Sequence, residues 1–174
     1  LMWNYENCIG YSNSRNGDVM RKGLKPFGIE AVRRMDDLGM LVDVSHASDG
    51  TFWDVLKYSR KPVVASHSNC RMLCNHPRNL TDEMIRSLAQ TGGVAGINFY
   101  GVFLGTGKMA EAEAVGQDST IEAMTAHILH MIRVGGSGFP AIGTDFDGFD
   151  AEGIVEIPDV SKMERLWEAL KRAG

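Results

Sequence analysis

Hydrophobic and polar positions along this chain follow a repeating order of short apolar runs and longer amphipathic segments. The apolar runs cover residues 39–46, 62–68, 92–100 and 139–148. Continuous apolar runs of this length are typical of strands buried on both faces, as in a parallel sheet. Segments with helical spacing of apolar residues predict helices at 25–38, 49–59, 81–90, 119–134 and from 161 onward. The chain is therefore predicted to fold as one helix followed by four strand–helix units.

Local signals mark the expected helix starts. Thr81 is a candidate N-cap, and Ser119 and Ser161 each precede a glutamate by three residues, which is the spacing of a capping box. In the first helix, Phe27, Ala31, Val32, Met35 and Leu38 make up the predicted apolar stripe. Residues 1–7 are interpreted as the end of a preceding strand.

The loops around the strands favour one α/β architecture. Short loops precede the strands and longer, polar loops follow them, which favours a TIM-type (β/α)8 barrel over a doubly wound sheet, because barrel sites are built from the loops after the strands. A complete barrel needs about 250 residues, and this chain has 174. We therefore expect residues 1–174 to form one partial (β/α)8 domain, roughly the C-terminal half of a barrel whose N-terminal strands lie upstream.

Two of the predicted strands end in a Ser-His pair, at His46 and His67. The segment between them is long enough for one crossover helix, which makes the two strands parallel and usually adjacent. Both histidines then project from the carboxyl edge of the sheet, where α/β folds bind ligands and metals. Neutral imidazole is a preferred zinc ligand. The pair predicts a metal site, although either histidine alone could simply form a hydrogen bond at a strand end.

Charged residues follow the second and fourth predicted strands. Asp145 and Asp147 end the fourth strand and place carboxylates beside the predicted metal. An EF-hand would use Asp145, Asp147 and Glu156 at loop positions one, three and twelve, but Asp150 stands where that loop requires glycine. Arg78 follows the second histidine strand. Its fixed charge suits bidentate binding of a substrate carboxylate, whereas a solvated loop arginine is the default interpretation.

The remaining cysteines and histidines do not form a recognised metal motif. Four of them lie close together in the sequence, but their spacing is not the paired C-x2-C spacing of structural zinc sites: His67, Cys70, Cys74 and His76. The cysteines are therefore predicted to be free thiols. His127 and His130 lie three residues apart on a predicted helix. We expect both to be structural, with His127 beside an apolar stripe and His130 facing outward.

Composition excludes some classes of function. The net charge of −4 and the lack of a basic cluster argue against nucleic-acid binding. No segment approaches the ~18 consecutive apolar residues of a membrane span. Three cysteines without a disulfide framework favour a reducing, cytoplasmic compartment.

Six short motifs extend over almost the whole chain. They begin at residues 23 (GLKPFG), 41 (LVDVSH), 66 (SHSN), 76 (HPRNLTD), 96 (GINFY) and 143 (GTDFDG). As an ordered set they resemble the membrane (renal-type) dipeptidases, zinc peptidase family M19. The resemblance implies a (β/α)8 barrel that holds two zinc ions, bridged by a glutamate and a water, and that cleaves dipeptides through a metal-bridging hydroxide.

The resemblance also assigns roles to individual residues. His46 and His67 match two histidine ligands of one zinc ion. Arg78 matches the arginine that binds the substrate carboxylate, and Asp145 matches the catalytic acidic residue that meets the substrate amino group. The family's early His-x-Asp motif and bridging glutamate have no counterpart in this chain. Trp3 stands where mammalian members carry a substrate-contacting histidine.

The sequence leaves alternatives to a zinc dipeptidase. One keeps the barrel and the metal but hydrolyses another small amide or ester. Another is an inactive half-barrel that binds a metal or a partner. Because the outer strands of a half-barrel leave apolar edges open, we expect the segment to belong to a longer chain. Expressed alone, it should be insoluble, molten or assembled with a second copy as a homo-oligomer.

Overall fold

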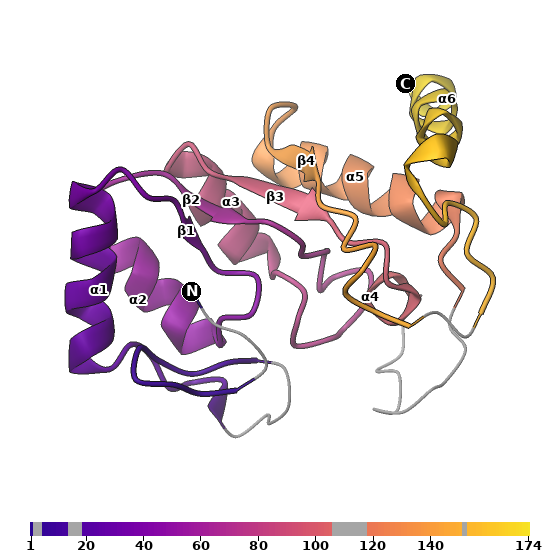
Figure 1. The fold of residues 1–174 in the computed structure, drawn as a ribbon. Coiled ribbons are helices and arrows are strands. Elements are labelled where there is room, and N and C mark those ends of the chain that lie inside the picture. The colour runs from indigo at the N-terminus through magenta and orange to yellow at the C-terminus, as the bar shows by residue number, and fades with distance from the viewer. Residues whose placement is uncertain (2–4, 14–18, 106–117, 151–152) are drawn as a thin grey trace.

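A parallel four-stranded sheet organises the chain (Figure 1). The computed structural model describes residues 1, 5–13, 19–105, 118–150 and 153–174. The strands are β1 (Val42–Asp43), β2 (Val63–Ala65), β3 (Val94–Ile97) and β4 (Pro140–Ile142). Each pairs in parallel with its neighbours in the order β1-β2-β3-β4, so strand order follows chain order. The prediction of an α/β fold with a parallel sheet is confirmed.

Helices alternate with the strands. They are α1 (Pro26–Asp37), α2 (Asp49–Tyr58), α3 (Asp82–Gln90), α4 (Gly101–Leu104), α5 (Ile121–Gly135) and α6 (Met163–Ala173), with a 3₁₀ turn, η2 (Val160–Lys162), before α6. Figure 1 shows α1, α2, α3 and α5 along one side of the sheet. Strand order in sequence, with helices on one side, differs from a doubly wound sheet, in which the strand order reverses. No helix in the described part of the chain is long and apolar enough to span a membrane.

The strands are shorter than the apolar runs that predicted them. β1 ends at Asp43, because the Asp43 carboxylate accepts a hydrogen bond from the backbone N–H of Ser45 and folds the chain into a turn. Val44 remains buried without extending the strand, whereas Met40 and Leu41, before β1, are exposed, so the predicted burial of the whole run is wrong. Each strand end therefore leads into a polar turn at the carboxyl edge of the sheet.

Two of the three predicted helix caps are wrong. The Thr81 hydroxyl caps α3 as predicted. At α5, however, Thr120 is the N-cap and its hydroxyl accepts the hydrogen bond of the first turn. Ser119 donates its hydroxyl proton to the carbonyl of Phe99 and pairs through its backbone with Val155. These long-range contacts hold Ser119 in extended conformation and move the helix start by one residue.

The start of the last helix also differs from the prediction. Ser161 lies inside η2, and Asp159 is the residue whose side chain caps this turn by accepting the Ser161 N–H. α6 follows after Lys162, which makes no side-chain cap. On the predicted apolar face of α6, Leu166 is buried whereas Trp167 is exposed.

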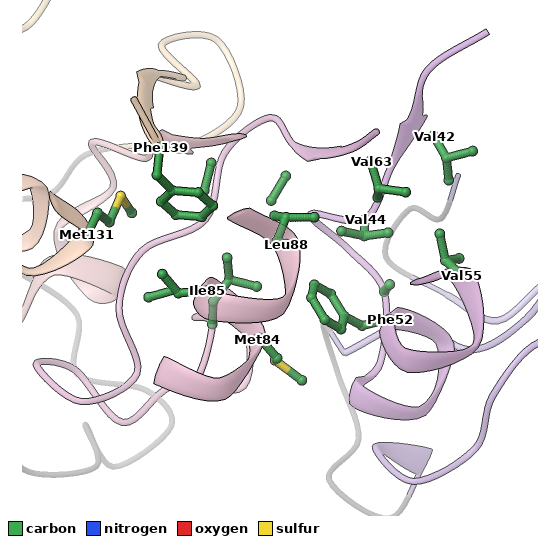
Figure 2. Close-up of a cluster of buried hydrophobic side chains, with 14 of the residues drawn as sticks. Val42, Val44, Phe52, Val55, Val63, Met84, Ile85, Leu88, Met131 and Phe139 are labelled. Atoms are coloured by element: carbon green, nitrogen blue, oxygen red, sulfur yellow. The ribbon is translucent and has the colours of Figure 1, made fainter. Parts of the chain in front are cut away.

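The main hydrophobic core lies between the sheet and its helices (Figure 2). Phe52 and Val55 of α2, and Ile85 and Leu88 of α3, are buried against valines of the first two strands. A second cluster joins α5 and α6 to the end of β3: Ile97, Phe99, Leu104, Met124, Ile128, Ile157 and Leu166. In α1, Val32 is buried as predicted, but Phe27 and Leu38 are exposed, so the predicted stripe is only partly in the core.

Two glycines let the ends of β3 and β4 approach the turn after β2. A Cβ atom on Gly96 or on Gly143 would collide with the carbonyl oxygen of Ser66. Neither collision can be relieved by rotating a side chain, because the obstacle is backbone. Glycine at these positions therefore fixes the position of Ser66 and of His67, which follows it.

Replacing Gly143 with alanine is expected to destabilise the full-length protein by about 1–3 kcal/mol, because the added methyl must displace backbone. Gly138→Ala is the matched control, since no described atom lies within 4 Å of its Cβ position. Denaturant unfolding of both variants measures the difference. Equal stabilities of the two variants would contradict the close approach at Gly143.

Candidate active site

The two histidines predicted from the strand ends lie together at the carboxyl edge of the sheet. His46 follows β1 and His67 follows β2, and these strands pair in parallel with Val42 opposite Val63. The Nε2 atoms of the two imidazoles are 2.9 Å apart, and the ring centroids are 4.9 Å apart. The predicted placement on adjacent parallel strands is confirmed.

The Asp43 carboxylate ties the two histidine-bearing turns together. Its Oδ1 accepts hydrogen bonds from the backbone N–H groups of Ser45 and Ser66, both at 3.0 Å, and from the Ser45 hydroxyl at 2.8 Å. Its Oδ2 accepts the Ser66 hydroxyl at 2.5 Å. Burial alone would raise the pKa of Asp43, but these hydrogen bonds together lower it below its ordinary value. Asp43 therefore remains ionised at neutral pH.

Both imidazoles are neutral at neutral pH. Burial lowers the pKa of His46 to about 3, and the positive charge of Arg78 lowers it further. The pKa of His67 is lowered by the same two causes in the same order, against the opposing charges of Asp145 and Asp43. Neutral imidazole carries the lone pair that a metal ion requires.

The pair fits part of a metal site. Two nitrogen ligands of one tetrahedral zinc ion, each about 2.0–2.1 Å from the metal, are separated by about 3.3 Å. The 2.9 Å between the Nε2 atoms of His46 and His67 is close to this value. Among the described residues, no group of three or more His, Cys, Asp or Glu side chains converges on one point. Of the ligands that a metal site needs, the described residues could supply these two nitrogens, and any others would lie outside them.

Arg78 is buried beside the histidines, so the default interpretation of a solvated arginine is wrong. Its side chain is covered although it lies in a loop, and the residue is only 4% exposed. Nη2 lies 3.3 Å from Nε2 of His46, and the guanidinium lies over the ring of Phe103. Nη1 is buried and has no hydrogen-bond partner among the described residues.

The charge of Arg78 survives its burial. Burial lowers its pKa to about 10, while the carboxylates of Asp145 and Asp43 oppose the shift. Arg78 is therefore protonated at neutral pH. A buried cation with an unused N–H donor is costly unless an anion or another acceptor binds it. The structure thus holds a buried positive group at this edge whose Nη1 donor has no partner among the described residues.

Polar contacts hold the Arg78 loop in place. Arg71 forms a bidentate ion pair with Asp49 at the start of α2, with both distances 2.8 Å. Arg71 also donates from Nε to the carbonyl of Asn79. The Asn79 amide donates to the carbonyls of Cys74 and Phe103. The loop is therefore fixed to α2 and α4, and the Arg78 position is determined by these contacts.

Asp145 follows β4 and is held by Asn98, a residue to which the sequence interpretation gave no role. Asp145 has a φ of +61°, a left-handed conformation that Asp adopts more readily than most residues. The Asn98 amide donates to its Oδ2 at 3.0 Å. Asn98 is in turn fixed by paired hydrogen bonds with Asn69. A buried asparagine directly after a strand is a signal that could have pointed to this role, because buried amides must be paired.

The EF-hand alternative does not match the structure. Glu156 accepts a hydrogen bond from the backbone N–H of Ile121 at 2.7 Å and pairs with Arg165, so its carboxylate serves the start of α5. Asp147 is exposed. Trp3, at the position of a substrate-contacting histidine in the resemblance, lies outside the described residues.

The cysteines are free, as predicted. Cys70 and Cys74 are buried, and their thiols point to backbone carbonyls. Burial raises the pKa of the Cys70 thiol to about 12, so this thiol stays protonated at neutral pH. These contacts are those of packed core thiols and differ from metal ligation.

His127 and His130 have structural roles, but the outward orientation predicted for His130 is wrong. His127 is buried, and its Nδ1 accepts the backbone N–H of Cys70 at 3.0 Å. His130 is also buried, and its Nε2 lies 2.7 Å from a carboxylate oxygen of Asp82. The reason is that α5 packs against α3 as well as the sheet, which covers the face on which His130 lies.

Stability is expected to fall in acid partly because of His127. Burial lowers its pKa to about 4 in the folded protein, from 6.5. The unfolded chain therefore binds a proton that the folded chain does not bind between these pH values. The His127 contribution is complete above pH 6.5 and is lost as pH falls towards 4, with a slope of up to about 1.4 kcal/mol per pH unit. Denaturant unfolding of the metal-free, full-length protein at several pH values measures this slope, which His127→Gln should make shallower. An unchanged slope in that variant would contradict the assignment.

Comparison with known proteins shows which family this chain resembles. The family model for membrane dipeptidase, peptidase family M19, matches residues 1–174. An uncharacterized protein of Klebsiella pneumoniae, from the region 5' of pqqA, is 36% identical over 99% of this chain and 62% of its own length. An uncharacterized dipeptidase of Schizosaccharomyces pombe is 38% identical over 89% of this chain and 35% of its own length.

A solved structure shares the fold over nearly the whole chain. It is a metallopeptidase from Rhodobacter sphaeroides, liganded with a phosphinate mimic of the dipeptide L-Ala-D-Ala. The TM-score is 0.83 at 26% identity, covering 99% of this chain and 48% of that one. The chain thus spans about half the length of these relatives. Since the family model matches the chain from end to end, the chain belongs to peptidase family M19, the membrane dipeptidase family.

Proposed function

We propose that the full-length protein is a zinc-dependent dipeptidase and that residues 1–174 supply the C-terminal half of its (β/α)8 barrel. The observation that carries this proposal is the juxtaposition of three groups at one sheet edge. Two neutral imidazoles, His46 and His67, face each other at 2.9 Å, and the buried cation of Arg78 lies 3.3 Å from the first of them. A metal and a carboxylate are the ligands that suit this combination.

The metal would be held on one side by Nε2 of His46 and Nε2 of His67. When bound, zinc supplies a Lewis acid for the scissile carbonyl and lowers the pKa of a bound water. Further ligands, including those for a second zinc ion, are assigned to the upstream half. This division follows from the described residues, which offer only the histidine pair, and from the relatives, which are up to about three times longer than the matched segment.

Arg78 would bind the free carboxylate of the substrate. Its unused Nη1 donor and its rigid, buried position favour an acceptor of fixed geometry, such as a carboxylate. Burial excludes water from the ion pair and strengthens it. A substrate whose carboxylate must lie close to the metal is short, which favours dipeptides over longer peptides.

Asp145 would bind the free amino group and assist proton transfer to the leaving amine. Its carboxylate is oriented by the Asn98 amide and acts electrostatically on both His67 and Arg78. A carboxylate within reach of the leaving group can donate or accept a proton there. The dipeptide mimic bound to the Rhodobacter sphaeroides relative supports a substrate of this class.

Hydrolysis assays of the full-length protein test the proposal. The protein is stripped with a chelator, reloaded with zinc, and offered dipeptides of both stereochemistries together with their N-acetylated and C-amidated forms. We expect zinc-dependent cleavage of the free dipeptides and poor cleavage of both blocked forms. If C-amidated substrates are cleaved as fast as the free dipeptides, a general amidohydrolase is favoured instead. If no dipeptide is cleaved at any zinc level, the dipeptidase proposal is wrong.

A further inference from the structure

A chain of hydrogen bonds connects Asp43 to the outer nitrogen of His67. The Asp43 carboxylate binds the Ser66 hydroxyl at 2.5 Å, and the same hydroxyl oxygen lies 2.7 Å from Nδ1 of His67. We propose that Asp43 and Ser66 form a relay that fixes His67 as the tautomer with its proton on Nδ1 and its lone pair on Nε2. The relay rests on the proposed function, because its purpose is to present Nε2 to the metal.

The direction of the relay follows from the donors around Asp43. Four hydrogen bonds converge on this carboxylate, from the N–H and hydroxyl groups of Ser45 and Ser66. An ionised carboxylate only accepts, so the single Ser66 hydroxyl proton points to Asp43. The Ser66 oxygen can then only accept from the imidazole. Nδ1 of His67 must therefore carry the proton.

The contacts of His46 place an unprotonated nitrogen opposite Nε2 of His67. A guanidinium has donors and no acceptor, so Nε2 of His46 must accept from Nη2 of Arg78. That nitrogen has one lone pair. With the proton of His67 on Nδ1, neither Nε2 carries a proton, so two unprotonated nitrogens lie 2.9 Å apart. A cation bound by both nitrogens would relieve their repulsion.

The backbone contacts make it possible to test the Ser66 hydroxyl separately. The Ser66 N–H bonds to Asp43, and the His67 N–H bonds to the Ser45 hydroxyl at 2.9 Å, without using the Ser66 side chain. Ser66→Ala therefore removes the relay and leaves the turn anchored. Ser66→Thr keeps the hydroxyl. Its added methyl has room, because Ser66 is exposed in the described part of the chain.

A matched control lies two residues away. Ser68 is buried in the same turn, and its hydroxyl has no hydrogen-bond partner among the described residues. Ser68→Ala thus removes a hydroxyl of the same kind from the same segment without touching the relay. All three variants are made in the full-length protein.

Two measurements test the relay. Zinc affinity, from competition with a chromogenic chelator, should fall about 10- to 100-fold in Ser66→Ala, which is typical for loss of a hydrogen bond to a metal-bound histidine. Ser66→Thr should restore it, and Ser68→Ala should leave it unchanged. In the metal-free protein, ¹⁵N NMR of the histidine rings should show the Nδ1-protonated tautomer of His67 in the native protein and a mixture in Ser66→Ala.

The outcomes separate the relay from the proposed function. Zinc binding and tautomer that are equal in Ser66→Ala and the native protein would overturn the relay while leaving the dipeptidase proposal intact. Failure of the native protein to bind zinc would overturn the dipeptidase proposal, and the NMR spectrum would still decide the tautomer. A native spectrum with the proton of His67 on Nε2 would overturn the relay by itself.

Discussion

Replacing His67 with alanine is expected to remove one metal ion from the full-length protein and to lower kcat/KM for dipeptides by at least about 100-fold, since loss of a ligand should exceed the cost of losing its hydrogen-bond partner. His46→Ala should have the same effect on the same ion, because the two Nε2 atoms are only 2.9 Å apart. Metal analysis of each variant after dialysis, together with steady-state kinetics, measures both effects.

The double variant gives the sharper result. If both histidines hold one ion, His46→Ala combined with His67→Ala should lose no more metal than either single variant, so the effects are not additive. His130→Gln is the control, because His130 binds Asp82 away from this edge of the sheet and should leave the metal content unchanged. Loss of two different ions by the two single variants would contradict a shared site.

Arg78→Ala is expected to lower kcat/KM by roughly 10- to 150-fold for free dipeptides, since a hydrogen bond to a charged group contributes roughly 1.5–3 kcal/mol. The loss should be confined to substrates with a free carboxylate. For the matched dipeptide amides, which lack this charge, the variant and the native protein should be similar. Kinetics on each dipeptide and its amide measure the difference.

Arg78→Lys separates charge from geometry. Lysine keeps the positive charge but cannot form the bidentate contact, so its activity should lie between the native protein and Arg78→Ala. Equal losses on dipeptides and their amides would mean that Arg78 supports the fold or the histidines. That outcome would contradict its role in binding the carboxylate.

Periodicity was sufficient to predict the order of the strands and of the longer helices, because buried strands and amphipathic helices leave different spacings of apolar residues. It did not predict the four-residue helix α4, which lies in a segment expected to be a loop. Their ends depend on contacts that the local sequence does not contain. Ser119 has the spacing of a capping box, but its contacts with Phe99 and Val155 hold it outside the helix. In the same way, His130 is buried because α5 packs against α3, which a single helix pattern cannot show.

The part of the candidate site that follows from the parallel direction of its strands could be predicted. Parallel neighbouring strands bring His46 and His67 to one edge, and this follows from a crossover helix of the right length. The burial of Arg78 was not predictable, because it depends on Phe103, which lies 25 positions further along the chain in α4. The Asn98 contact to Asp145 joins β3 to β4 and is visible only once the two strands are paired.

Anomalous diffraction from zinc-loaded crystals of the full-length protein tests the central claim most directly. Data collected on both sides of the zinc edge locate each ion without assumptions about its ligands. We predict a peak within bonding distance of both His46 Nε2 and His67 Nε2, about 2.0–2.1 Å from each. A fully loaded protein without a peak between these two nitrogens would contradict the assignment of this sheet edge as the metal site.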